Sequence, residues 1–319
     1  MEEPKNVPLP DTQQLQDLGF GSVVTQQSKQ RLLNRNGTFN VNRIGLSYLS
    51  SINPFHFMLT ISWTRFFAIV SLGYIALNGF FALLYLLCGP GALQGAGAER
   101  FPYPFEAAFF FSVQTLATIG YGQITPVGLA ANCLVTVESL FGLMSFALIT
   151  GVLFSRFSKP VAKIRFSRFA LIAPYQNITA FEFRITNERR NEIIQLEAKL
   201  LFSRFETTNG SRFRRFYDLA LERPKVVFFP LSWTIVHPID SKSPLYQVTE
   251  AQMIESEAEF LVLLSGIDET FSQNVQTRTS YKMSELIWNA KFSSVYVPDP
   301  EGKTLKIDIE RLDLIEKLS

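Results

Sequence analysis

Residues 109–122, FFFSVQTLATIGYG, decide the fold of this chain. The apolar run that begins at Phe105 and ends at Leu116 is too short to cross a bilayer. Two glycines follow it closely, and glycine accepts left-handed backbone angles, so successive carbonyl groups can point the same way. The sequence therefore predicts a short helix over residues 105–117, followed by a row of aligned carbonyls. The residues of that row are Thr118, Ile119, Gly120, Tyr121 and Gly122.

Two long apolar runs flank this stretch. Residues 66–87 carry no charge, and at about 1.5 Å rise per residue they span roughly 33 Å, the thickness of a bilayer core. Residues 127–154 are similarly apolar, with one charge, Glu138. Non-helical backbone at membrane depth must be buried in protein or line water. We therefore expect two membrane-spanning helices, with residues 118–122 between them and facing a pore or cavity.

A ring of backbone carbonyls can replace the hydration shell of K⁺, and a sequence of this type is typical of potassium-selective filters. One chain supplies a quarter of such a ring. We therefore expect a homotetramer with K⁺ as the permeant ion. The alternative is a chance glycine turn in a membrane loop, but its position after a half-helix and between two spanning helices favours the filter.

The composition agrees with a membrane protein, since 47% of the residues are hydrophobic and 30 are phenylalanine. A net charge of +2 does not indicate a nucleic-acid partner. The two cysteines and two histidines are isolated in the sequence, and no nucleophile is spaced for pairing with a base. We expect no cofactor, no structural metal and no enzymatic activity.

Basic residues cluster before the first span and after the second. We therefore expect a multi-pass protein of the cell membrane with both termini in the cytoplasm. Residues 1–45 predict a cytoplasmic segment without an export signal. In residues 46–63, Asn53 and Pro54 are typical of an N-cap and a first helical residue. This segment predicts an amphipathic helix on the inner membrane surface, or alternatively a downward extension of the first span.

The pattern changes from helical runs to strands at about residue 165. In TAFEFRIT, residues 179–186, apolar and polar side chains alternate with the period of two that is typical of a strand. Further short apolar runs recur with turn residues between them. We predict an α + β membrane protein, with a two-helix pore domain over residues 64–158 and a cytoplasmic β-sandwich over residues 159–319.

Several separated motifs resemble inward-rectifier potassium channels, most closely their prokaryotic branch. They are FFFSVQTLATIGYG at 109–122, FGLMSFALITGVLFSRFSKPVAKIRFS at 141–167, HPIDSKSPL at 237–245 and GIDETFSQNVQTRTSY at 266–281. The resemblance extends from about Asn34 to near Ile309. It implies an immunoglobulin-like cytoplasmic domain that assembles as a tetramer and extends the pore.

The resemblance also implies roles for individual residues. Gly142 matches the glycine at which the inner helix can bend, and Phe154 matches the bulky residue that narrows the bundle crossing. An apolar ring in a narrow water path can close it by dewetting, although Phe154 could instead face lipid. A loop over residues 268–276 matches a cytoplasmic constriction, for which we name Asp268, Glu269 and Phe271.

This sequence departs from the common family pattern behind the filter and in the cavity. Gln114 and Gln123 stand where many members have an acidic and a basic residue, so a neutral hydrogen bond is expected to support the filter in place of an ion pair. Phe146 stands where strong rectifiers carry an acidic residue in the cavity. We therefore expect only weak block by cytoplasmic polyamines, that is, weak rectification.

Glu138 is costly within a spanning helix if it is unpaired, at about 3 kcal/mol. Two interpretations remain: it hydrogen-bonds to the pore helix or filter, or it presents charge to ions in the cavity. The sequence places Glu138, together with Phe146, among the candidate cavity residues.

A basic cluster is predicted at the inner face of the membrane, where each charge near anionic lipid contributes about 1 kcal/mol. It at least anchors the helix, and regulation by anionic phospholipid is expected from the resemblance. The residues are Arg156, Lys159, Lys163 and Arg165.

Two other functions remain open on the sequence alone. A cation channel with little K⁺ selectivity would keep this fold, although Tyr121 and the two filter glycines argue against it. The second is a membrane-anchored sensor that does not conduct ions, but in such a protein the re-entrant segment would have no function.

Overall fold

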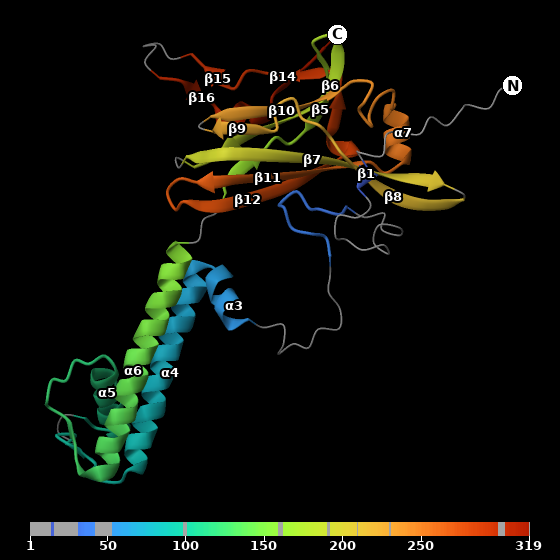
Figure 1. The fold of residues 1–319 in the computed structure, drawn as a ribbon. Coiled ribbons are helices and arrows are strands. Elements are labelled where there is room, and N and C mark those ends of the chain that lie inside the picture. The colour runs from blue at the N-terminus through green and yellow to red at the C-terminus, as the bar shows by residue number, and fades with distance from the viewer. Residues whose placement is uncertain are drawn as a thin grey trace. The chain divides into compact units, whose positions relative to one another are not determined.

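A computed structural model describes residues 14–15, 31–41, 53–97, 101–158, 162–189, 192–208, 210–229, 231–298 and 304–318. The chain divides into two compact units, residues 44–159 and residues 1–43 with 160–319 (Figure 1). The first unit is helical and the second is rich in strands. The described N-terminal residues therefore group with the β-rich unit. Most of the predicted segment 1–45, and residues 46–52 of the predicted interfacial helix, lie outside the described residues.

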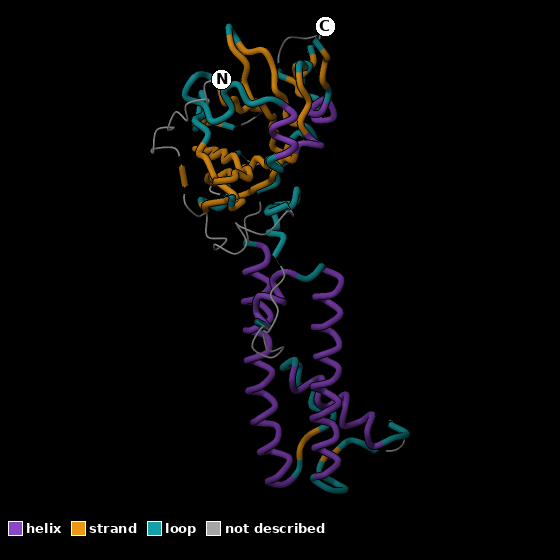
Figure 2. The backbone as a smooth tube through the Cα atoms, turned by 90° about the vertical axis from the view of Figure 1, so that its right-hand side faces the viewer, coloured by secondary structure: helices purple, strands orange, loops and turns teal. Residues whose placement is uncertain are grey.

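The helical unit contains two helices long and apolar enough to cross a membrane, α4 (Trp63–Leu87) and α6 (Gly128–Phe157). Figures 1 and 2 show them side by side, with the short helix α5 (Pro104–Leu116) at one end of the pair. The strand β2 (Leu93–Gln94) precedes α5 and pairs with β3 (Thr125–Pro126), which precedes α6. The predicted order of spanning helix, half-helix, filter and spanning helix is confirmed.

A separate helix, α3 (Pro54–Thr60), precedes α4. It begins as the sequence predicts, because Asn53 accepts a hydrogen bond from the backbone of His56 and Pro54 occupies the first turn. It ends because Ile61 is extended, with ψ 159°. Ser62 then caps α4, so α3 is no continuation of the span and Trp63 belongs to α4 rather than to the interfacial helix.

The C-terminal half of α4 packs against α5 through a small apolar cluster that includes Phe81, Tyr85, Ala108 and Phe111. The ring of Tyr85 meets that of Phe111 edge-on at 5.0 Å. Only one face of α6 is buried within the chain, and its buried residues are Ala131, Glu138 and Gly142. These three are seven and four residues apart, so they form one stripe along the helix.

The β-rich unit consists of two sheets packed face to face. The first has the order β1-β8-β7-β11-β12, with β9 also on β7, and the second has the order β10-β6-β5-β13, with β4 also on β6. The strands of the first sheet are β1 (Gln14–Leu15), β7 (Ile193–Thr208), β8 (Ser211–Asp218), β9 (Lys225–Phe228), β11 (Glu259–Asp268) and β12 (Gln273–Lys282). Those of the second are β4 (Ile164–Phe166), β5 (Ala170–Tyr175), β6 (Ile178–Asn187), β10 (Ser232–Ile239) and β13 (Leu286–Trp288). The helix α7 (Glu250–Glu255) precedes β11.

The alternation in residues 179–186 places Phe181, Phe183 and Ile185 of β6 in the core between the sheets. Phe181 stacks on Phe260 of the opposite sheet, with ring centroids 4.1 Å apart. Core residues therefore come from both sheets, and the predicted sandwich is confirmed.

The polar face of β6 is also covered. Arg184 is buried, its guanidinium lies 4.6 Å from the ring of Phe292, and it donates a hydrogen bond of 2.7 Å to the carbonyl of Ser293. Phe292 belongs to β14 (Ala290–Phe292), which pairs with β17 (Ile315–Lys317). A second small pair is β15 (Tyr296–Val297) with β16 (Lys306–Ile307), and single turns of 3₁₀ helix cover Met283–Glu285 and Ile309–Asp313.

The described segment 31–41 is fastened to the β-rich unit. Leu32 and Leu33 are buried against Phe216 and Leu261. The backbone amide of Leu32 donates to the carboxylate of Glu259 at 3.1 Å, and that carboxylate also pairs with Arg214 at 3.4 Å. The segment thus supplies a partner to a buried ion pair, which explains why it belongs to this unit.

Candidate functional site

The predicted filter has an alternating backbone. Thr118, Gly120 and Gly122 have left-handed angles, with φ 56°, 59° and 77°, whereas Ile119 and Tyr121 between them do not. Alternation of left- and right-handed residues turns successive carbonyl groups towards one side of the chain. Sequence reasoning expected this of the two glycines only. Thr118 joins them although a left-handed threonine is strained, and such strain concentrates at functional sites.

The filter is open to its surroundings within one chain. Ile119 is 47% exposed and Tyr121 is 69% exposed, although both are large and apolar over most of their surface. Within the described part of one chain, these two side chains are therefore left for packing against something else. That arrangement agrees with the expectation that one chain contributes a quarter of the cage.

Backbone hydrogen bonds hold the start of the filter to the end of α5. The amide of Ile119 donates to the carbonyl of Gln114 at 2.8 Å, and the amide of Thr118 donates to the carbonyl of Thr115 at 3.0 Å. The carbonyl of Gln114 thus supports the filter through the main chain, and the expected support by its side chain stays a prediction.

The end of the filter is held by the loop that follows α4. Leu93 pairs with Pro126 and Gln94 with Thr125, so the β2–β3 ladder fixes the chain directly after the filter. Gly95 lies so close to this strand that a Cβ atom on it would be 2.0 Å from the carbonyl oxygen of Gln123. The sequence predicted a loop here but gave no signal for this pairing, because each strand is only two residues long.

Glu138 joins the three helices of the pore unit. It is fully buried, the hydroxyl of Tyr85 on α4 donates to it at 2.5 Å, and it hydrogen-bonds with the hydroxyl of Ser112 on α5. Ser112 also lies 3.1 Å from the amide oxygen of Asn78 on α4. The assignment of Glu138 to the cavity is therefore wrong for this structure. Its carboxyl group is enclosed among hydrogen-bonding partners, as the first of the two interpretations required.

Gly142 lies one turn after Glu138, against the end of α5. A Cβ atom at Gly142 would be 2.5 Å from the carbonyl oxygen of Leu116, which leaves no room for a side chain. Because α6 is continuous through this position, the structure gives Gly142 a packing role. The expected bending role stays a prediction.

Two other predicted pore residues project from α6. Phe146 is 75% exposed and Phe154 is 72% exposed in the single chain. The exposure of Phe154 is compatible with both alternatives that the sequence left open, a gate in the pore and a side chain that faces lipid.

The residues of the basic cluster belong to both units. Arg156 lies in the helical unit and donates hydrogen bonds to the carbonyl groups of Met58 and Ile61, and its role as a lipid ligand stays a prediction. Lys159 lies outside the described residues. Lys163 is exposed, and Arg165 pairs with Asp313 at 3.7 Å, both in the other unit.

The predicted cytoplasmic constriction is the turn between β11 and β12. Asp268 is 1% exposed, and its carboxylate accepts a hydrogen bond from the amide of Thr270 at 2.9 Å. It therefore shapes the turn and is wrong as a lining residue. Glu269 and Phe271 are exposed at the tip, so they remain candidates.

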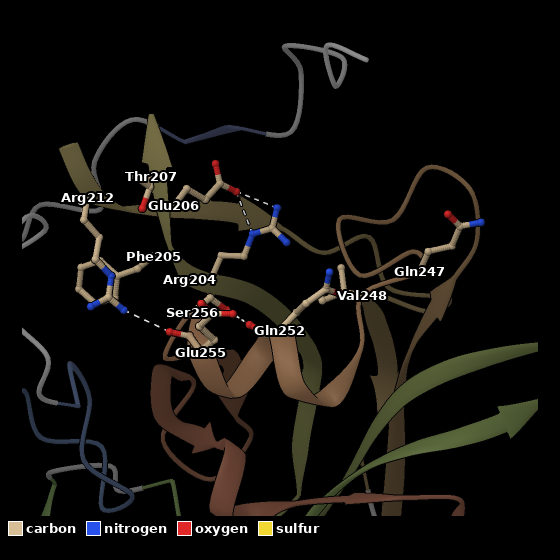
Figure 3. A pocket seen from close by; sticks show the side chains of 10 residues that line it. All are labelled: Arg204, Phe205, Glu206, Thr207, Arg212, Gln247, Val248, Gln252, Glu255 and Ser256. Carbon is tan, nitrogen blue, oxygen red and sulfur yellow. Dashed lines mark hydrogen bonds and ion pairs between the residues drawn. The ribbon is translucent and has the colours of Figure 1, made fainter. Parts of the chain in front are cut away.

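A polar hollow of about 820 Å³ opens at the end of β7, β8 and α7 (Figure 3). Its two arginines already have partners, since Arg204 pairs with Glu206 at 2.7 Å and Arg212 pairs with Glu257 at 3.1 Å. Among the described residues no group of histidine, cysteine and carboxylate side chains could hold a metal ion. The filter therefore remains the candidate site.

Comparisons with known proteins agree with these features. A family model described as "Inward rectifier potassium channel C-terminal domain" matches residues 164–319, and one described as "Ion channel" matches residues 69–159. The first covers the β-rich unit from residue 164 onward, and the second covers most of α4, all of α5 and the filter, and α6.

Known relatives match over most of the chain. It is 39% identical over 285 residues to inward rectifier potassium channel Kirbac3.1 of Paramagnetospirillum magnetotacticum, covering 89% of this chain and 95% of the relative. It is 30% identical over 298 residues to G protein-activated inward rectifier potassium channel 1 of Bos taurus and of Homo sapiens, covering 86% of this chain and 59% of each relative. The chain thus spans less than two thirds of the animal proteins.

A solved structure of Spo0M, a sporulation control protein from Bacillus subtilis, aligns with 39% of this chain and 49% of its own length, at 8% identity and a TM-score of 0.23. That likeness carries no argument.

Proposed function

This chain belongs to the inward rectifier potassium channel family, and from that premise we propose that four copies form a K⁺-selective pore in a cell membrane. The observation that carries the proposal is the alternating backbone of residues 118–122, held at its start by α5 and at its end by the β2–β3 ladder. Four such segments would surround an ion with carbonyl oxygens, as a dehydrated K⁺ requires. Both chain termini would lie in the cytoplasm.

The test is flux from purified protein in liposomes of defined lipid. We expect a tetramer that passes K⁺ in strong preference to Na⁺ and that Ba²⁺ blocks near Thr118, because Ba²⁺ fits K⁺ sites but carries twice the charge. Equal passage of Na⁺ and K⁺ would identify a weakly selective cation channel. Absence of any flux from intact tetramers would favour a sensor that does not conduct.

The gate of this channel is proposed at Phe154. Its exposure within one chain supports the idea, because four such rings meeting at the end of α6 would exclude water from a narrow path. Phe154→Ala should raise the basal K⁺ flux of a variant that remains tetrameric. Unchanged flux would move the gate elsewhere, with Glu269 and Phe271 as the next candidates.

Weak rectification is the third part of the proposal, and it depends on the charge of the pore cavity. An aromatic ring at Phe146 supplies no charge to attract a polyamine, and the enclosure of Glu138 by Tyr85 and Ser112 supports the view that it adds none. Spermine should therefore block wild-type currents weakly. Phe146→Asp should strengthen the block, whereas steep wild-type block that Glu138→Gln abolishes would assign rectification to Glu138.

Modulation by anionic phospholipid is the last part of the proposal. Lys163 supports this part because it is exposed, so its ammonium is free to meet an anionic headgroup. Replacing Lys163 with Gln should shift the dependence of K⁺ flux on the fraction of anionic lipid, measured in liposomes of graded composition. No shift would exclude this residue as a lipid contact.

A further inference from the structure

The chain directly after the filter is braced by the loop that follows α4. The backbone amide of Val127 donates to the carbonyl of Ala92 at 2.8 Å, and the β2–β3 ladder pairs the residues between them. Figure 2 shows the ladder, in orange, at the end of the helical unit where α5 lies. Two short segments that are distant in sequence therefore form one small sheet next to the filter.

Gly95 brings these two segments closest together. Its φ of 86° is left-handed, and a Cβ atom on it would lie 2.0 Å from the carbonyl oxygen of Gln123 and 3.1 Å from the carbonyl carbon. One Cα hydrogen of Gly95 therefore points at this oxygen, as in the weak Cα–H···O contacts between adjacent strands. Another L-residue at position 95 would have to displace the main chain of Gln123, because a backbone carbonyl cannot turn aside as the tip of a side chain can.

Gln123 has little freedom to move away from the filter. The next residue, Ile124, is buried and belongs to the apolar cluster that also contains Phe81 and Phe111. The residues after Ile124 are held in the ladder. On the other side of Gln123 lies Gly122, the last filter residue, where an added Cβ atom would meet nothing within 4 Å. A displacement of Gln123 is therefore transmitted more easily to the filter than to the cluster.

The two ends of the filter depend on different supports. Its start is held by α5, because its first two backbone amides donate to carbonyl groups in the last turn of that helix. Its end continues into Gln123, which lies against the loop after α4. A side chain at position 95 should therefore disturb the carbonyl groups near Gly122 and leave those near Thr118 in place.

We propose that Gly95 is a positioning residue for K⁺ selectivity. It acts through Gln123: because it places only a hydrogen atom against that carbonyl, it fixes the position of the last carbonyl groups of the filter. Selectivity depends on how the carbonyl oxygens surround the ion, and a permeating ion is bound at several sites in turn. The proposal rests on the proposed channel function and names a residue outside the filter that sets its selectivity.

Gly91 provides the matched control. It lies in the same loop with nearly the same backbone angle, φ 88°, but nothing lies within 4 Å of an added Cβ atom. Gly91→Ala and Gly95→Ala therefore carry a similar cost for a left-handed alanine, and only Gly95→Ala places an atom against Gln123. A difference between the two variants is thus assigned to that contact.

The first measurement is K⁺ and Na⁺ flux through isolated tetramers in liposomes of one lipid composition. We expect Gly95→Ala to lower the K⁺/Na⁺ permeability ratio by about tenfold, which corresponds to about 1.4 kcal/mol. Gly91→Ala should keep the wild-type ratio. Because the ratio is taken from conducting tetramers, it does not depend on how many molecules fold. An unchanged ratio in Gly95→Ala would overturn the proposal.

The second measurement is block by Ba²⁺ applied from the cytoplasmic side, which separates a local shift from a general loosening of the pore. Ba²⁺ is expected near Thr118, at the end of the filter that α5 holds, so its block should stay close to wild type in Gly95→Ala. Loss of both the block and the selectivity would mean that the whole helical unit is disturbed. That result would contradict a positioning role for Gly95.

Mixed tetramers keep the test decisive if four altered copies do not assemble. Gly95→Ala chains are co-expressed with an excess of wild-type chains, and tetramers that contain an altered copy are isolated by its affinity tag. One displaced copy changes a quarter of the carbonyl ring, so the permeability ratio should still fall below that of mixed tetramers containing Gly91→Ala. Failure of these mixed tetramers to form, when those with Gly91→Ala do form, would reduce Gly95 to a folding role. Wild-type tetramers that pass K⁺ and Na⁺ equally would instead refute the selective channel on which the proposal rests.

Discussion

The two units of this chain differ in how much of their apolar surface they bury by themselves. The β-rich unit encloses a continuous core in which Phe181, Phe202 and Phe260 are fully buried. By contrast, α6 is 30 residues long and buries only one stripe of three residues, while its side chains Phe146 and Leu148 are exposed in the single chain. The β-rich unit therefore completes its core within one chain, and the helical unit is completed by lipid and by further copies. Substitutions should accordingly act on folding in the first and on assembly and conduction in the second.

The largest effect on assembly and K⁺ flux is expected at Gly142. A methyl group there would lie 2.5 Å from the carbonyl oxygen of Leu116, and such overpacking costs about 1–3 kcal/mol in each chain. Gly142→Ala should sharply reduce the yield of tetramer and the K⁺ flux, as measured by size-exclusion chromatography and liposome assay. Gly151→Ala is the control on the same helix, because nothing lies within 4 Å of the added atom. Equal behaviour of the two variants would remove the packing role of Gly142.

Phe260 tests the comparison from within the β-rich unit. It is fully buried and stacks on Phe181, so Phe260→Ala should cost about 3–5 kcal/mol of folding free energy in the β-rich unit. Phe80 on α4 is 55% exposed in the single chain, and Phe80→Ala should cost far less. Denaturant unfolding of both variants, followed by near-ultraviolet circular dichroism, measures the difference. Similar losses of folding free energy in the two variants would show that the units do not differ in how much burial within one chain stabilises them.

Glu138 sharpens the comparison within the helical unit, where a polar cluster lies beside the small apolar cluster. Glu138→Ala removes the shared partner of the Tyr85 and Ser112 hydroxyls, and because Ser112 keeps Asn78, the cost of about 1–3 kcal/mol falls on Tyr85. Glu138→Gln preserves the shape and can still bond to both. Thermal dissociation of the tetramer should therefore fall for Glu138→Ala and stay near wild type for Glu138→Gln. The reverse order would mean that charge, rather than hydrogen bonding, is what the site requires.

The smallest effect is expected from His237 in the β-rich unit. One ring nitrogen lies 2.6 Å from the carbonyl of Ala220, to which it donates, and the other lies 2.7 Å from the hydroxyl of Ser243, from which it accepts. Burial lowers the pKa of His237 below its usual value, against a weaker opposing effect of Asp240 and Asp218. At His237 the unfolded chain therefore binds a proton more readily than the folded chain does.

The stability of this unit should consequently fall as the pH drops below about 6.5, the usual value for an unfolded histidine. Denaturant unfolding of the whole protein between pH 7 and pH 5 measures the slope, and His237→Gln should make it shallower. His56→Gln, in the helical unit, is the control and should leave the slope as in wild type. A slope unaffected by His237→Gln would assign the pH dependence to carboxylates.

Much of the architecture follows from local patterns in the sequence. Uninterrupted apolar runs of the right length identify α4 and α6, because a bilayer sets the length of a spanning helix. Asn53 and Pro54 identify the start of α3 for a similarly local reason, since they satisfy or remove orphan amides of the first turn. The filter is recognisable because its glycines are required by a backbone conformation that other residues adopt with strain.

The partners of single side chains could not be predicted in this way. The sequence left open whether Glu138 forms a hydrogen bond or faces ions, and it predicted a lipid contact for Arg156; in the structure each of them bonds to groups from other helices. Tyr85 lies 53 positions from Glu138, and Met58 lies 98 positions from Arg156. Nothing in either neighbourhood of the sequence identifies the other residue, because such contacts arise only when α3, α4, α5 and α6 are packed.

The sequence by itself determined the two spans, the half-helix with its filter, the β-sandwich and the family, since each depends on periodicity, length or a short motif. Only the tertiary structure decided that Thr118 shares the left-handed backbone of the filter glycines, that Gly142 makes room for the carbonyl of Leu116, and that Arg156 bonds to the carbonyl of Ile61. The physical reason is that secondary structure and membrane insertion are set by neighbours along the chain. The surroundings of a buried polar or glycine residue are set by whichever distant segments the fold brings against it.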